Sequence, residues 1–131
     1  MTTSLFSCIE SITKLSEESW SCLQPALKEM DLQKGDYLLK EVEVANSIFF
    51  INRGYCRTFY NKEGEDISTG FFFEHDFVTN LNSLTKREKS KYNIEACEAL
   101  SVVKLDRIKL LEAYTKSVRP KFQRTIDFSI F

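Results

Sequence analysis

The stretch LQKGDYLLKEVEVANSIFFINRGYCRTFY, residues 32–60, decides the fold. It alternates short aromatic or branched apolar runs with turn residues. The segments 32–36 and 52–54 predict turns, because Gly, Asn and Asp tolerate the backbone angles that tight turns need. The apolar runs beside these turns are too short for helices and have the composition of strands. Short strands are therefore expected at 37–39, 48–51 and 55–60.

The same alternation continues beyond this stretch. Asn61 to Gly64 predicts a hairpin loop, with glycine where a positive φ is wanted. Further strands are expected at 67–73, 77–78, 92–96 and 101–105. Many short strands joined by turns are typical of a β-sandwich or β-roll, and not of a parallel α/β sheet.

Both ends of the chain have helical periodicity. Apolar residues recur at spacings of three and four over residues 4–30, with Pro25 as a kink or interruption. Asp106 is suited to cap a helix, and Pro120 suits the first turn of a last one. We therefore expect one domain over 1–131, mainly β, with a double-stranded, jelly-roll-like β-roll and flanking helices. Its parts are N-terminal helices at 1–30, the roll at 31–105 and C-terminal helices at 106–131.

Composition excludes several classes of protein. The 131 residues include 18 basic and 19 acidic ones, a net charge of -1, whereas nucleic-acid-binding modules carry a positive excess. No apolar run is long enough for a membrane span, and the N-terminus has no signal-peptide pattern. The four cysteines form no CxxC pair, which indicates reduced thiols and a cytoplasmic protein. His75 is the single histidine and Ser, Cys and His form no nucleophile pattern, so neither a metal site nor a catalytic site is predicted.

A series of motifs carries a family resemblance. The turn and strand of 34–41, the aromatic strand ending in Arg53-Gly54, the Asp76-Phe77 turn and the strands 95–96 and 102–105 follow one another in a familiar order. This order resembles the cyclic nucleotide-binding domain, particularly the sensor half of Crp/Fnr-type bacterial transcription regulators. The resemblance covers about residues 25–131 and implies a β-roll flanked by helices.

The ligand cassette of that family departs from its pattern here. In that family a Gly and an Arg bind the phosphate and a Glu binds the ribose. By the resemblance, Thr79 stands at the position of the Gly, Asn80 at that of the Glu, and Ser90 near that of the Arg. It therefore implies a sensor with a degenerate cassette, which does not bind cAMP in the usual way. The segment has two interpretations, a capped helix without ligand or a polar pocket for a small anionic or nucleotide ligand. The pocket would consist of Thr79, Asn80, Leu81, Asn82, Ser83, Lys89, Ser90 and Lys91.

Three other features have a functional and a structural interpretation. The basic run 86–91 is a solvated loop or an anion-binding segment. Phe71 to Phe73 pack in the core or form a partner surface, and alternation along a strand turns Phe72 to the opposite side from its neighbours. His75 takes a turn position in the resemblance. The structural interpretation is favoured for all three.

The C-terminal segment predicts an interface. Apolar residues recur along one helical face at Val118, Phe122, Ile126 and Ile130. In the family that the chain resembles, the corresponding helix joins two subunits, so the resemblance implies a homodimer. Binding of DNA would need the helix-turn-helix domain that follows in those regulators and is absent from this chain. The alternative is a ligand-free dimerisation or interaction scaffold of the same fold.

Overall fold

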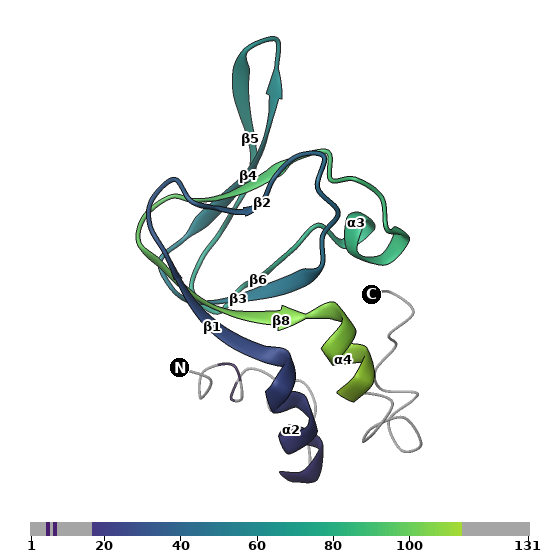
Figure 1. Cartoon of the computed structure of the whole chain (residues 1–131). Coiled ribbons are helices and arrows are strands. Elements are labelled where there is room, and N and C mark those ends of the chain that lie inside the picture. Colours follow the sequence, from purple (N-terminus) through teal and green to yellow (C-terminus); the bar gives the residue numbers. More distant parts are fainter. Residues whose placement is uncertain (1–4, 6, 8–16, 114–131) are drawn as a thin grey trace.

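The computed structural model describes Leu5, Ser7 and residues 17–113 (Figure 1). Helices stand before and after the strands, and one short helix interrupts the strands. The helical elements are α2 (Glu17–Leu23), the short 3-10 helix η1 (Gln24–Ala26), α3 (Leu81–Lys86) and α4 (Arg107–Ala113). The strands are β1 (Leu27–Leu32), β2 (Tyr37–Leu39), β3 (Ser47–Arg53), β4 (Cys56–Lys62), β5 (Glu65–Phe72), β6 (Phe77–Val78), β7 (Asn93–Ala96) and β8 (Leu100–Asp106).

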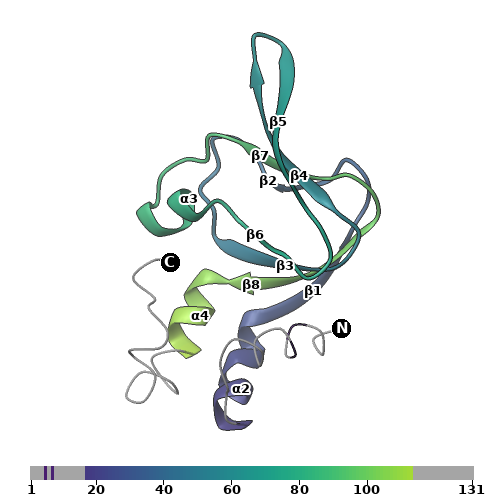
Figure 2. The same cartoon turned by 180° about the vertical axis from the view of Figure 1, so that it is seen from behind.

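These strands form two antiparallel sheets of four. One has the order β1-β8-β3-β6 and the other β2-β7-β4-β5. The β4–β5 hairpin projects beyond the body of the roll in both views (Figures 1 and 2). The β-roll predicted from the turn pattern is confirmed.

Apolar residues pack on both sides of the sheet that contains β8. Leu100 and Val102 belong to the core between the two sheets. Val103 and Leu105 alternate with them and pack in a second cluster with Ala26 and Leu110, under the helices. The helices α2 and α4 therefore cover the outer face of this sheet (Figure 1).

The prediction that the N-terminal helical region continues through residue 30 is wrong for residues 27–30. Pro25 lies in η1, and the chain then becomes extended as β1. Leu27 pairs with Leu105 and Leu32 with Leu100, so β8 supplies the hydrogen bonds of this segment. Leu27 faces the helices and Leu32 faces the inner core, which a strand permits because its side chains alternate. The roll therefore begins at Leu27 and not at residue 31.

Asp106 caps α4 as predicted, because its Oδ2 accepts a hydrogen bond from the backbone N–H of Lys109 at 3.1 Å. The helix begins directly after β8. The remaining helical predictions, over residues 8–16 and 114–131, lie outside the described residues. No helix in the described part of the chain is long and apolar enough to cross a bilayer.

Candidate functional site

Asn80 organises the segment where the cassette was predicted. It is 6 % exposed and stands at the N-cap of α3, where its Oδ1 accepts a hydrogen bond from the Ser83 N–H at 3.2 Å. Its Nδ2 donates to the Ser90 Oγ at 2.9 Å. Both ends of the carboxamide are therefore engaged within the protein.

Two buried serines hold the neighbouring loops. The Ser83 Oγ accepts from the Ala45 N–H at 2.8 Å and donates to the Glu88 carbonyl at 2.5 Å. The Ser90 Oγ donates to the Tyr92 carbonyl at 2.6 Å. These bonds join α3 and its following loop to the segment before β3. They satisfy buried polar groups that would otherwise lack partners.

The structure brings together four of the eight predicted pocket residues. Thr79 donates from its Oγ1 to the Ser47 carbonyl at 2.7 Å and lies next to Asn80. The Asn80 side chain bonds to the Ser90 Oγ and to the Ser83 N–H, so three of these four residues are joined directly. The other four residues are exposed: Leu81, Asn82, Lys89 and Lys91.

Arg87 is a contributor that sequence reasoning missed. It takes a left-handed backbone conformation at the C-cap of α3, with φ +58°. Its Nη1 donates to the Ala45 carbonyl at 2.7 Å and its Nη2 to the Asn46 Oδ1 at 2.6 Å. The basic run therefore includes one guanidinium that holds a distant loop. Nothing local in the sequence distinguishes it from its charged neighbours.

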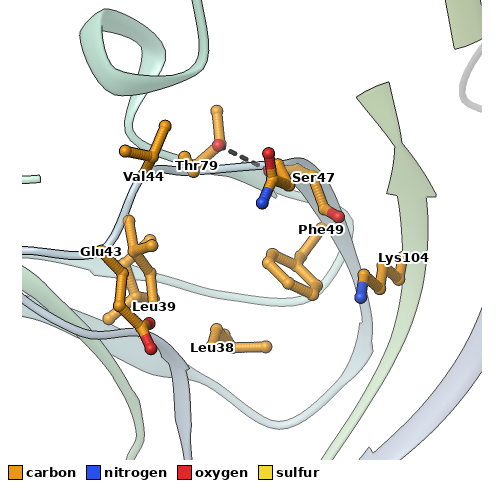
Figure 3. Close-up of a pocket in the computed structure, with 11 residues that line it drawn as sticks. Leu38, Leu39, Glu43, Val44, Ser47, Phe49, Thr79 and Lys104 are labelled. Carbon is orange, nitrogen blue, oxygen red and sulfur yellow. Dashed lines mark hydrogen bonds between the residues drawn. The ribbon is translucent and has the colours of Figure 1, made fainter. Parts of the chain in front are cut away.

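A cavity of about 450 Å³ lies between the two sheets, beside this segment (Figure 3). Its apolar wall comes from both sheets, with Leu38, Leu39, Phe49 and Ile94. Its polar and rim residues are Glu43, Val44, Ala45, Asn46, Ser47, Thr79 and Lys104. Of these cavity residues, only Thr79 was predicted from the sequence. The others come from four separate segments of the chain, which only the packing of the two sheets brings together.

The aromatic run 71–73 divides as alternation predicts. Phe72 packs against the inner core. Phe71 and Phe73 are about half exposed, at 51 % and 55 %, and both rings lie against Tyr55, so the favoured core packing is wrong for these two. His75 has a φ of +71° in its turn, and its ring stacks on Phe50 at 5.9 Å. The turn role predicted for His75 is confirmed.

The Cys56 and Cys97 thiols are not activated. Burial raises the pKa of Cys56 to about 12 and also raises the pKa of Cys97, above the range in which a thiolate forms at neutral pH. Cys22 is a free thiol as well. Among the described residues no three His, Cys, Asp or Glu side chains are grouped to hold a metal ion.

Comparisons with known proteins agree with this architecture. The family model described as "Cyclic nucleotide-binding domain" matches residues 29–117. No curated protein sequence matches the chain significantly.

Three solved structures illustrate the likeness of fold. The catabolite activator protein of Thermus thermophilus superposes with a TM-score of 0.66 at 13 % identity, over 80 % of this chain and 49 % of that one. The N-terminal domain of a transcriptional regulator from Streptomyces coelicolor A3(2) gives 0.70 at 17 % identity, over 86 % and 79 %. The regulatory domain of Toxoplasma gondii PKA, crystallised with cAMP, gives 0.68 at 16 % identity, over 92 % and 48 %.

The chain thus spans about half the length of the catabolite activator protein. The match of the family model covers most of the chain, from within β1 to beyond α4, and includes α3 and the loop that ends at Ser90. The chain belongs to the cyclic nucleotide-binding domain family.

Proposed function

We propose that the chain is the regulatory sensor domain of a Crp/Fnr-type transcription regulator, acting in the cytoplasm as a homodimer, and that its cassette does not bind cAMP in the usual way. It is a binding domain and not an enzyme. The observation that carries the proposal is the buried hydrogen bond between Asn80 and Ser90, at 2.9 Å. The likeness to the catabolite activator protein and to the Streptomyces regulator supports the regulator assignment.

The Asn80–Ser90 pair occupies the two positions at which the resemblance places an acid and an arginine. A carboxylate is suited to accept a ribose hydroxyl, and a guanidinium pairs with a phosphate through two charge-assisted bonds. Both side chains here are neutral, and their polar atoms already have partners within the chain. Lys89 and Lys91 flank Ser90 in the sequence but are exposed, and an ammonium lacks the planar fork of arginine.

The alternative is a ligand-free interaction scaffold of the same fold. Its support is the half-exposed aromatic group of Tyr55, Phe71 and Phe73 at the start of β4 and the end of β5. Exposed aromatic residues of this kind are enriched at protein interfaces. This second function would be favoured if mutation of Phe71 abolished binding of a protein partner and left the sensor response intact.

A thermal-shift series tests the first proposal. Wild-type protein is expected to show no change in Tm with cAMP or cGMP. The variant Thr79→Gly/Asn80→Glu/Ser90→Arg restores the cassette residues and is expected to gain a shift. At about 100 times Kd, bound ligand adds about 2.7 kcal/mol to stability, which is several degrees in a domain of this size.

The control variant Asn82→Glu/Lys91→Arg adds the same types of side chain at exposed neighbouring positions. It should remain unresponsive, and circular dichroism should show that both variants keep the fold. A clear shift of wild-type protein with cAMP would overturn the proposed loss of cassette function.

A further inference from the structure

Lys104 places a cation at the cavity between the two sheets of the roll. It follows Val102 by two positions on β8, so it lies on the face of the sheet that carries the inner core. It pairs across the sheet with Phe49 and lines the cavity between the sheets. In Figure 3 its ammonium extends toward Phe49 and Leu38, while Glu43 and Leu39 lie on the other side of the same space.

A second lysine lies directly opposite Lys104. Lys28 of β1 is its partner in the antiparallel register, and such partners share one face of the sheet. Like charges that face each other across strands repel and lower stability. Among the described residues neither lysine forms an ion pair. An anion between the two would remove this repulsion.

Of the other charged and polar groups at the cavity, Arg87 and Ser47 favour an anionic ligand and Glu43 does not. Glu43 is the acidic lining residue; it lies across the cavity from Lys104, and its Oε1 accepts from the Lys40 N–H at 2.9 Å (Figure 3). Arg87 contributes a further positive charge at Ala45 and Asn46, on the rim. Ser47 lines the same cavity, is 5 % exposed, and its hydroxyl has no hydrogen-bond partner. A buried polar group without a partner is uncommon in folded proteins and fits a role in ligand recognition.

We propose that this cavity binds a small amphipathic carboxylate. The carboxylate lies between Lys104 and Lys28 at the mouth, and the apolar body packs on Leu38, Phe49 and Ile94. The volume of about 450 Å³ falls within the range of small-molecule sites, which combine mostly apolar walls with a few polar groups. This inference goes beyond the proposed function, because it concerns a cavity whose cationic groups are not part of the Asn80–Ser90 cassette.

A titration of the ¹⁵N-labelled full chain, followed by NMR, tests the site with three probes of one length. They are octanoate, 1-octanol and octylammonium, which share an eight-carbon chain and carry an anionic, a neutral and a cationic head group. Octanoate should shift the backbone amide signals of Leu39, Ala45 and Phe49 in a saturable way. It should bind about tenfold or more tightly than the other two, because a hydrogen bond to a charged group contributes more than a neutral one.

Lys104→Met keeps the aliphatic part of the side chain and removes the charge. It should weaken octanoate binding about tenfold and leave octanol binding unchanged. The matched control is Lys62→Met, at the exposed tip of the β4–β5 hairpin, which should alter neither. Both variants should retain the dispersed amide spectrum of the folded chain.

Three results would overturn the proposal. Octylammonium or octanol binding as tightly as octanoate would remove the role of the cations. Signal changes centred on residues 80–91 would place the ligand in the cassette, whereas Thr79 lines both. Absence of octanoate binding, together with shifts caused by a poly-glutamate peptide, would make the lysines a protein-docking surface. A response to cAMP bears on the proposed loss of cassette function and leaves this test unaffected.

Discussion

At the scale of single residues, Gly54 and Gly35 have the same backbone conformation in different surroundings. Their φ angles are +92° and +91°, which disfavours any residue with a side chain. A Cβ on Gly54 would lie 2.5 Å from the Ala99 carbonyl oxygen, whereas a Cβ on Gly35 would meet nothing within 4 Å. Both alanine variants should therefore lose about 1–2 kcal/mol of stability to the conformation. Gly54→Ala should lose at least about 1 kcal/mol more, since backbone must move. Urea unfolding measures both, and equal losses would contradict the clash.

Cys56 predicts a pH dependence of stability. Its folded pKa is about 12 because of burial, whereas the ordinary value is 9.0. Between these values the unfolded chain loses the thiol proton and the folded chain keeps it, so stability falls as pH rises, by up to about 1.4 kcal/mol per pH unit. Well below pH 9 the thiol is protonated in both states and contributes no slope.

The variant Cys56→Ala isolates this effect, because Tyr92 and Cys97 also have raised pKa values and add to any alkaline loss. From about pH 8 to about pH 10.5, urea unfolding should show wild type losing roughly 1–2 kcal/mol more than the variant. Parallel pH profiles would contradict the prediction. The absolute stability of the variant does not matter, since only the slopes are compared.

At the scale of elements, α3 depends on one of its two asparagines. Asn80 caps the helix and bonds to Ser90, while Asn82 is exposed two residues later. Asn80→Ala should lower the free energy of unfolding by about 2 kcal/mol, because it removes a cap and leaves the Ser83 N–H without its partner. Asn82→Ala should change it by less than about 0.5 kcal/mol. Chemical denaturation with both variants measures this difference, and equal effects would show that the cap contributes little.

At the scale of the whole molecule, the predicted dimer depends on the stripe Val118, Phe122, Ile126 and Ile130, which lies outside the described residues. Phe122→Glu/Ile126→Glu places two like charges in the middle of that stripe and should convert a dimer to a monomer. Sedimentation equilibrium on the full chain gives the mass directly. Lys62→Glu, on the projecting hairpin, is the charged control and should leave the mass unchanged. A monomeric wild type, or a variant that stays dimeric, would contradict this interface.

The sequence by itself determined most of the strands of the roll. Turn residues such as Gly35, Gly54 and Gly64 take the positive φ angles expected of them. The runs beside them are too short for helices and are rich in residues that suit strands. The cap at Asp106 followed from equally local chemistry. Each of these turn, strand and cap preferences involves only a few neighbouring residues, so the sequence alone is enough to predict it.

Only the tertiary structure decided how distant segments meet. Residues 27–30 have a helical pattern, but pairing with β8 makes them a strand. The Asn80–Ser90 bond, the contact of Arg87 with Ala45 and the opposition of Lys28 to Lys104 each join different segments. Hydrogen-bond partners and cavity walls depend on strand register and sheet packing, which involve residues far apart in the chain. The position of the family's cassette was therefore recognisable from the order of motifs in the sequence. The contacts of its replaced residues, and the cavity beside them, depended on the fold.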